Sequence, residues 1–418
     1  MNTNKRKIVN DPVYGFISIN NDLIFDLIEH PWVQRLRRIR QLGLTNLVYP
    51  GAMHTRFQHV LGAYFLMNQA IEVIRSKGHE ITDEEAEAVN IAILLHDIGH
   101  GPFSHALEFG IIEGFTHESI SELLMAGLNA QFNNRLTLAI AIFQDKYHKR
   151  FLHQLVSGQL DMDRLDYLRR DSFFTGVSEG VVGSDRIIKM LNVVDDKLVV
   201  EAKGIYSIEK FLIARRLMYW QVYLHKTVLS AENLLINILK RAKELSLQGD
   251  KLFAPPALEY FLFKKFDRSF INAADEKDLN TMLQHFVRLD DTDIISATKV
   301  WMEHDDKILS TLCQKMISRQ LYKIELQNQP FSAERIAEMI EKTEKHFSLS
   351  SKEASFMVFA DSITSNIYET GEHNIGILYN NGKVVDIAEA SDMLNMQVLT
   401  KVVTKHFLCY PKEIISKI

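Results

Sequence analysis

The chain has 418 residues, of which 46% are hydrophobic, and it carries a formal net charge of −5 at pH 7. This length suits two domains or one large domain with an extension, and the near-neutral charge argues against a general nucleic-acid or membrane binder. The two cysteines, Cys313 and Cys409, lack metal-type spacing and exclude a disulfide framework. No apolar run approaches the roughly 18–20 residues of a membrane helix, and the N-terminus lacks the apolar stretch of a secretory signal, so we expect a cytoplasmic protein.

Apolar residues recur at three- and four-residue steps along most of the chain, a period typical of helices. In chain order, this period predicts helices over 54–75, from 83 into 97, over about 158–171 and over about 207–245. Thr82 and Glu85 fit a capping box at the start of the second helix. Two glycines and a proline then end it, namely Gly99, Gly101 and Pro102.

Two short β-hairpins are predicted between the helices. One lies near 190–203 and turns at Asp195 and Asp196; the other lies near 374–388, where Asn381 and Gly382 suit a tight primed turn. The stretch from Gly249 to Pro256 is the predicted domain boundary. We therefore expect a mainly α protein with a helical core over 1–250 and a mostly helical C-terminal region with one hairpin over 251–418.

Histidines are unusually dense in the segment "HDIGHGPFSH", residues 96–105, at the end of an apolar helix. Imidazole nitrogens and carboxylate oxygens are ligands of borderline divalent metals, and His100 lies four residues beyond His96. His59 and Asp163 would join such a site from other helices, as in helical-bundle metal sites. Alone, a histidine at a helix end is more often solvated, and an aspartate in "DRLDYLRRD" is more often an ion-pair partner. Three histidines at a Gly-Pro break favour the metal site.

Several longer motifs carry a family resemblance. They are "NDPVYGFISI" at 10–19, "PWVQRLRRIRQLG" at 31–43, "YPGAMHTRFQHVLG" at 49–62, "LLHDIGHGPFSH" at 94–105, "DRLDYLRRDSFFTGV" at 163–177 and "YLHKTVLSAE" at 223–232. Over about 8–245 the chain resembles the HD-domain metal-dependent phosphohydrolases, in their deoxynucleoside triphosphate triphosphohydrolase branch. The resemblance implies an HD-domain helical bundle and one divalent ion, which could be Fe, Mn, Zn, Ni or Mg. The implied metal ligands are His59, His96, Asp97 and Asp163.

The resemblance also implies roles around the metal. His105 and His117 would act as general acid and proton relay at the scissile phosphate, with Glu108 beside His105 where relatives often carry Asp. The implied phosphate contacts are Arg56, Arg164 and Arg215. The branch includes a mammalian relative, an enzyme that carries a sterile-alpha-motif domain, and this relative has Lys in place of Arg164. The implied sugar and base contacts are Gln41, Leu42, Tyr167, Asp171 and Tyr223.

The basic stretch "QRLRRIRQ" at 34–41 has two interpretations. The simpler one is an amphipathic helix whose arginines are solvated. The resemblance instead associates Gln34 and Arg37 with an activating guanine nucleotide bound between subunits, which would require a homo-oligomer. Glu29 stands where the mammalian relative uses an aspartate, which departs from that pattern.

The favoured activity is hydrolysis of a dNTP to deoxynucleoside and triphosphate. A first alternative is another HD phosphohydrolase that acts on a nucleoside monophosphate, a cyclic dinucleotide or an alarmone. A second is a nucleotide sensor that binds without turnover, although such a sensor would be expected to have lost one ligand. Nuclease activity is a weaker option because it depends on the basic stretch alone, and it would show a steep salt dependence.

Overall fold

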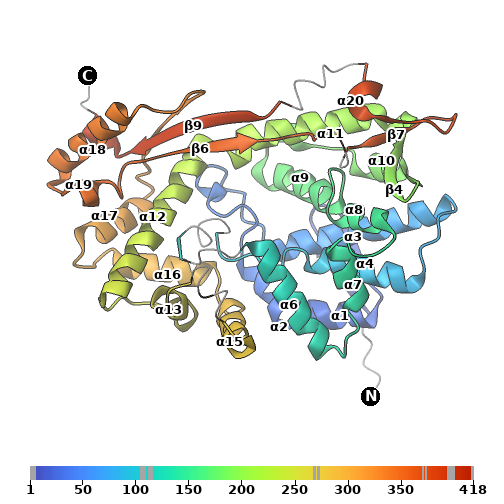
Figure 1. Ribbon diagram of the computed structural model, residues 1–418, viewed down its shortest axis with the longest axis horizontal. Helices are drawn as coiled ribbons and strands as arrows, with labels where there is room; N and C mark the ends of the chain where they lie inside the picture. Colours follow the sequence, from blue (N-terminus) through green and yellow to red (C-terminus); the bar gives the residue numbers. More distant parts are fainter. Residues whose placement is uncertain are drawn as a thin grey trace.

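The computed structural model describes residues 6–103, 110–111, 116–266, 270, 274–369, 371, 374–392 and 401–415. Within these residues the protein is mainly α-helical, with three small β-sheets (Figure 1). This confirms the expected fold class. No described helix is both long enough and apolar enough to cross a membrane.

Three helices form the centre of the N-terminal part: α3 (Arg56–Ser76), α4 (Asp83–Leu95) and α9 (Met162–Thr175). α3 packs against both of the others. The predicted capping box of Thr82 and Glu85 begins α4, as expected. Shorter helices surround these three: α1 Asp22–Glu29, α2 Pro31–Gln34, the 3-10 turn η1 Arg35–Arg38, α6 His117–Gln131, α7 Thr137–Phe143, α8 Arg150–Val156 and α10 Ser184–Lys189.

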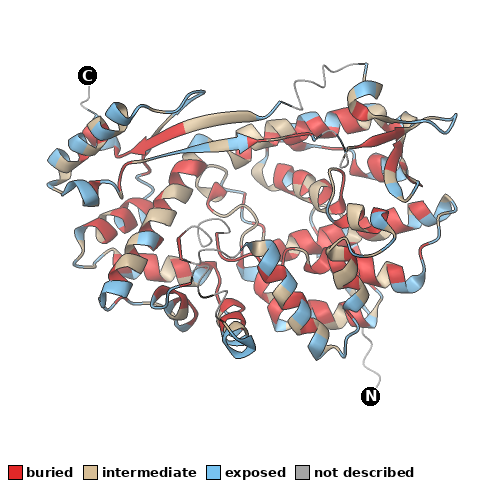
Figure 2. Ribbon diagram, in the orientation of Figure 1, coloured by how far each residue is buried: buried red, intermediate tan, exposed pale blue. Residues whose placement is uncertain are grey.

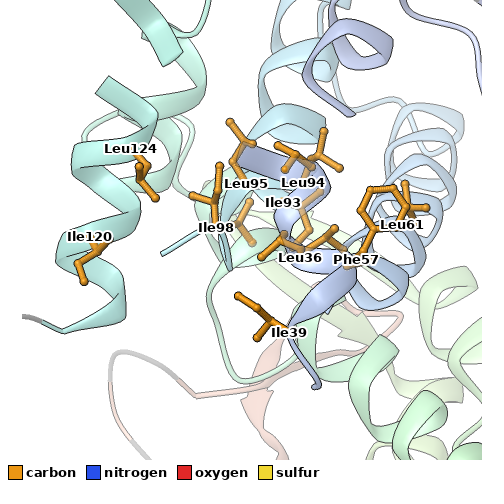
Figure 3. Close-up of a cluster of buried hydrophobic side chains, with 14 of the residues drawn as sticks. Leu36, Ile39, Phe57, Leu61, Ile93, Leu94, Leu95, Ile98, Ile120 and Leu124 are labelled. Atoms are coloured by element: carbon orange, nitrogen blue, oxygen red, sulfur yellow. The ribbon is translucent and has the colours of Figure 1, made fainter. Parts of the chain in front are cut away.

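The core between these helices is aliphatic. Figure 3 shows Phe57 and Leu61 of α3 beside Ile93 of α4, with Ile98 and Leu36 in the same cluster. Every one of these side chains is at most 2% exposed. At about 25 cal/mol per Å² of apolar surface removed from water, such burial dominates the stability of the bundle. The end of α4, which carries the histidine-rich motif, is therefore anchored in the buried core.

The predicted long helix over 207–245 is wrong in one respect, because it is broken. α11 (Ile205–Met218) runs into a π-turn, η5 (Tyr219–Tyr223), and α12 (Lys226–Gln248) follows. The Leu224 N–H donates to the Tyr219 carbonyl at 2.7 Å, and the His225 side chain caps the new helix. π-turns of this kind occur frequently at functional sites.

The C-terminal part continues with helices that pack against α12 and one another (Figure 1). They are α13 Pro256–Leu262, α15 Glu276–Phe286, α16 Asp291–Trp301, α17 Lys307–Ile317, α18 Ala333–Phe347 and α19 Ser351–Ala354. α20, Ile387–Ala390, instead contacts α11. Figure 2 shows buried faces along helices of both parts of the chain, and one hydrophobic cluster includes residues from both. The two-domain division at about residue 250 stays a prediction.

Both predicted hairpins are present. Asp195 and Asp196 turn β3 (Leu191–Val194) into β4 (Lys197–Glu201) with φ of 48° and 60°. β7 (Gly376–Leu378) and β8 (Val384–Asp386) form the second hairpin. The sequence did not reveal that β4 and β7 pair in parallel, which joins the two hairpins into one four-stranded sheet.

The C-terminal region contains, besides its predicted hairpin, a sheet that the sequence did not reveal. A three-stranded antiparallel sheet in the order β5-β9-β6 is also present, built from β5 (Lys323–Gln327), β6 (Phe359–Ser365) and β9 (Val403–Tyr410). Its strands are far apart in the chain, so no turn motif marks their pairing. A further hairpin, β1 (Lys7–Asp11) with β2 (Gly15–Ile19), lies near the N-terminus.

The arginine-rich stretch does not form the expected solvated helix. Arg35, in η1, is fully buried, and its guanidinium donates to the carbonyl oxygens of Leu289, Ile98 and His100 at 2.8–3.2 Å. These acceptors lie 63 to 254 positions away in the chain, so local pattern could not reveal them. Arg35 thereby holds residues 96–103, which we call the histidine-rich loop, against the segment between α15 and α16.

Asp291, at the start of α16, predicts a pH-dependent stability. Burial raises the pKa of this carboxyl to about 6 even though it accepts from the Arg40 amide. Between about pH 4 and pH 6 the unfolded chain loses this proton first, so the free energy of unfolding falls as pH rises through that window. Asp291→Asn removes this titration. As the pH rises through the window, the free energy of unfolding of the variant should therefore increase by on the order of 2 kcal/mol relative to that of the wild type.

Urea unfolding of both proteins at pH 4.5 and pH 7 measures this difference. Asp22→Asn, at an exposed position of α1, is the matched control for loss of a carboxylate. A constant difference between Asp291→Asn and the wild type at the two pH values would contradict the prediction.

Candidate active site

A cavity of about 800 Å³ opens beside the end of α4. Its walls come from many parts of the chain. They include the segment around residues 41–45, the start of α3, the histidine-rich loop, the start of α6, α9, the π-turn with α12, and strands β6 and β9. This volume falls within the range of roughly 300–1,000 Å³ of small-molecule sites. Predicted site residues on its described wall are Gln41, Leu42, Arg56, His96, Asp97, His117, Asp163, Tyr167, Asp171 and Tyr223.

Three of the four predicted metal ligands converge on one point. One nitrogen or oxygen atom from each of His59, His96 and Asp163 lies within 4.8 Å of the other two. His59 Nε2 is 3.3 Å from His96 Nε2 and 3.1 Å from Asp163 Oδ1. α3, α4 and α9 each supply one of these groups at or next to a helix end, and the mutual packing of the helices fixes their spacing.

The far sides of both imidazoles have partners that orient them. His59 Nδ1 lies 2.7 Å from Asp166 Oδ2, and His96 Nδ1 lies 2.6 Å from the Ile93 carbonyl oxygen. Each Nδ1–H donates there, which leaves the two Nε2 atoms to face the cluster. Histidines that bind metals have this arrangement in general. Two imidazole nitrogens and a carboxylate oxygen suit a borderline divalent ion better than calcium, which prefers all-oxygen sites.

Asp97, the fourth predicted ligand, lies beside this cluster. Its Oδ1 is 3.4 Å from His96 Nε2 and its Oδ2 is 3.7 Å from His59 Nε2. Oδ2 also accepts from Arg56 Nη1, and Oδ1 lies 3.1 Å from His100 Nε2. Arg56, predicted to contact phosphate, thus forms a buried ion pair with Asp97 on the cavity wall.

The electrostatics of the cluster keep its carboxylates charged. Burial raises the pKa of Asp97, but Arg56 and His100 outweigh it and hold that pKa well below its ordinary value. The pKa of Asp163 is likewise lowered, because hydrogen bonds from His59 and His96 outweigh its burial. Burial and the charge of Arg56 lower the pKa of His100 to about 3, so its ring is neutral. The site therefore presents anionic oxygens to a cation.

Ser121 of α6 fastens the histidine-rich loop. Its hydroxyl accepts from the Gly99 amide and donates to the His96 carbonyl oxygen, both at 2.9 Å. A Cβ on Gly99 would lie 2.2 Å from the His117 carbonyl oxygen and 2.4 Å from the Ser121 nitrogen. Only glycine allows α6 to approach the loop this closely.

We therefore expect Gly99→Ala to push α6 away from the loop. Overpacking of this kind costs about 1–3 kcal/mol of stability, and metal content and turnover should fall with it, since His96 and Asp97 precede this contact. Gly183→Ala is the matched control, because a Cβ there meets no atom within 4 Å. Thermal unfolding, metal analysis and turnover of the two variants measure the effect. Equal behaviour of the two variants would contradict this account of Gly99.

His117 stands at the first position of α6, and its ring stacks on His100 with centroids 3.9 Å apart and planes 17° apart. Its Nε2 lies 3.1 Å from Glu118 Oε1. His117 thus stacks on a neighbour of Asp97 and lines the same cavity, and its role as proton relay stays a prediction. The predicted acid His105 and its partner Glu108 lie outside the described residues.

A second polar group lies on the cavity wall where a sugar contact was expected. The Tyr223 hydroxyl donates to Asp171 Oδ2 at 2.8 Å, and His54 Nε2 lies 2.7 Å from Asp171 Oδ1. The rings of Tyr167 and Tyr223 meet edge to face at 6.1 Å. Burial, followed by the charge of Asp171, raises the pKa of Tyr223 well above its ordinary value, so its hydroxyl stays protonated.

Four of the predicted contacts do not lie on the described wall of this cavity. Arg164 donates to Asp161 and the Gly158 carbonyl oxygen, and Arg215 donates to the Ile367 carbonyl oxygen at 2.7 Å. Gln34 donates to the Ile28 carbonyl oxygen, and its own Oε1 accepts from Arg37, which stacks over Phe57. Their predicted roles stay predictions.

Sequence reasoning missed the residues that support the site. Asp166 and Arg170 form a fully buried pair behind His59, and His54 is buried behind Asp171. The i, i+4 spacing of Asp166 and Arg170 is compatible with an ion pair, but nothing local indicates that such a pair is buried. His54 lies in a motif that carries the family resemblance, and only its neighbours in space give it a role.

Two family models match the chain. One, described as HD domain, covers residues 56–171, and the other, described as HD associated region, covers residues 182–254. The first spans α3 to α9 and includes all four predicted metal ligands. The second spans the β3-β4 hairpin, the π-turn and α12.

Individual relatives agree with these matches. YwfO, an uncharacterized protein of Bacillus subtilis, is 33% identical over 98% of this chain and 93% of its own length. A Dictyostelium discoideum protein named deoxynucleoside triphosphate triphosphohydrolase SAMHD1 homolog is 31% identical, over 64% of this chain and 53% of its own length. A crystal structure of a phosphohydrolase from Bacteroides thetaiotaomicron is 56% identical, with a TM-score of 0.93 over 97% of this chain and 99% of that chain. The chain therefore belongs to the HD-domain phosphohydrolases.

Proposed function

We propose that this protein hydrolyses deoxynucleoside triphosphates to deoxynucleoside and inorganic triphosphate. The observation that supports this most is that His96 and Asp163 of the His59–His96–Asp163 cluster line the same cavity as the Asp171–Tyr223 pair. The first group suits a phosphate-bound metal ion, and the second suits a sugar hydroxyl. The name of the Dictyostelium relative points the same way.

A divalent ion bound by His59, His96, Asp163 and Asp97 would polarise a phosphoryl oxygen and make a water molecule more acidic. The protein's own side chains neutralise phosphate charge and transfer protons. Arg56 offsets phosphate charge from the cavity wall, and Arg164 and Arg215 are proposed to join it. His117 and His105, with Glu108 beside His105, carry protons to the leaving oxygen.

Asp171 accepts from the 3′-hydroxyl of the sugar in this proposal, and Tyr223 crowds the 2′ position so that ribonucleotides fit poorly. Tyr167, Gln41 and Leu42 line the remaining sugar and base positions. Gln34 and Arg37 are proposed to bind an activating nucleotide in a homo-oligomer. A cytoplasmic location remains part of the proposal.

One assay tests the proposal. The purified protein is incubated with Mn²⁺ and each of the four dNTPs, with and without GTP, and inorganic tripolyphosphate is quantified. We expect stoichiometric tripolyphosphate and deoxynucleoside. Release of inorganic monophosphate or pyrophosphate from a dNTP would overturn the proposed cleavage site. Turnover only of nucleoside monophosphates, cyclic dinucleotides or alarmones would overturn the proposed substrate, and both results would leave the family assignment intact.

A further inference from the structure

His54 is a buried histidine outside the metal cluster. It directly precedes the N-cap of α3, its side chain is 0% exposed, and its ring stacks on Phe174 with centroids 4.5 Å apart. Its Nε2 lies 2.7 Å from Asp171 Oδ1, and its Nδ1 is buried without a hydrogen-bond partner among the described residues. An N–H at Nδ1 would be buried without an acceptor, so the proton belongs on Nε2, which donates to Asp171.

The Asp171 carboxylate is consequently held from two sides. His54 donates to Oδ1 and the Tyr223 hydroxyl donates to Oδ2 at 2.8 Å. A carboxylate has about four lone-pair sites, so each oxygen keeps capacity for one more donor from the cavity, whose wall includes Asp171. The backbone of His54 is also tied to the cavity wall, because its carbonyl oxygen accepts from the amide of Gln41, a wall residue, at 3.0 Å.

We propose that His54 is a positioning residue that sets specificity for the sugar 3′-hydroxyl. It fixes the orientation of the Asp171 carboxylate from behind, so that one lone pair faces the 3′-OH of the bound nucleotide. This inference rests on the proposed function and deepens it. His54 itself lies behind the wall and contacts no substrate.

The test compares dNTPs with 2′,3′-dideoxynucleoside triphosphates, which lack only that hydroxyl. Two variants separate the roles of the ring and the donor. His54→Phe keeps a ring that can stack on Phe174 but removes the donor, whereas His54→Gln keeps a donor near the Nε2 position but removes the ring. We expect His54→Phe to lower kcat/KM for dNTPs about tenfold or more, mostly through KM, and to leave the dideoxy substrates nearly unchanged. His54→Gln should retain most of the preference for the 3′-OH.

Other outcomes are equally informative. A merely structural role would lower turnover of both substrates in parallel and would overturn the inference. If His54→Phe does not fold, as thermal unfolding would reveal, His54→Gln is compared with His54→Asn, whose amide is too short to reach Asp171. Equal preference for the 3′-OH in that pair would overturn it as well.

Wild-type turnover separates this inference from the function that it rests on. If the wild type releases no tripolyphosphate from any dNTP, the proposed function fails and takes the inference with it. If the wild type does so but His54→Phe keeps its preference for dNTPs over dideoxy substrates, only the inference about His54 fails.

Discussion

Asp163→Ala should lose its bound divalent metal and lower kcat/KM by about three orders of magnitude or more. Asp163 is the anionic member of the three-residue cluster, 3.1 Å from His59 Nε2 and 3.6 Å from His96 Nε2. Without it, only two neutral imidazoles and Asp97, whose Oδ2 is already paired with Arg56, would remain to hold the divalent ion. Its side chain is 28% exposed, so its removal leaves no closed cavity in the core and the fold should survive.

Metal content by elemental analysis and tripolyphosphate release measure the two effects, and circular dichroism confirms the fold. Asp185→Ala is the matched control, since that carboxylate is 66% exposed and pairs only loosely, at 3.7 Å, with Arg169. It should keep both metal and turnover. An Asp163→Ala protein with wild-type metal content and wild-type turnover would remove Asp163 from the site.

Local sequence signals account for the parts of this site that were predicted. The capping box at Thr82 and the break at Gly99 depend on neighbouring residues, so the end of α4 could be placed at the histidine motif in advance. The convergence of His59 and Asp163 on His96 came from the family resemblance, because helical periodicity alone does not say which helices meet. The structure brings these three together.

What escaped prediction depends on contacts between distant segments. Arg35 looks like any arginine of a basic helix, yet its three acceptors are backbone oxygens from two other parts of the chain. The strands β5, β6 and β9 pair across long stretches of sequence, so no turn residues mark them. β6 and β9 nevertheless supply part of the cavity wall. The role of a polar residue is therefore hardest to predict from sequence when its hydrogen-bond partners are far away in the chain.

The buried pair of Asp166 and Arg170 behind His59 is the clearest example of a polar contact that the sequence did not reveal. We expect it to make the largest contribution to the stability of the site. Arg170 and Asp166 are both fully buried, with Arg170 Nε 2.9 Å from Asp166 Oδ2 and Arg170 Nη1 2.7 Å from Asp11 Oδ2. Asp166 also accepts from His59. A Cβ on Gly62 would lie 2.0 Å from Asp166 Oδ1, so the pair packs directly against the backbone of α3.

Arg170→Met is therefore expected to cost roughly 3–5 kcal/mol of unfolding free energy, because it leaves two buried carboxylates without their cation. Arg169→Met is the matched control. The Arg169 side chain is 31% exposed, and loss of such a partly solvated charge costs less than about 1 kcal/mol. Urea unfolding of the two variants and the wild type measures the difference, and equal losses in the two variants would contradict this role for the buried pair.

A second substitution separates the stability of the pair from its effect on the metal. Adding Asp166→Asn to Arg170→Met removes one uncompensated charge, so part of the lost stability should return. Asn can still accept from His59 Nδ1, but it is neutral and makes the imidazole a weaker ligand, so metal affinity should stay about 10–100-fold below that of the wild type. Recovery of stability without recovery of metal affinity would show that Asp166 acts on the metal through His59. If stability and metal affinity recover in parallel, the Asp166–Arg170 pair contributes to folding alone and does not act on the metal.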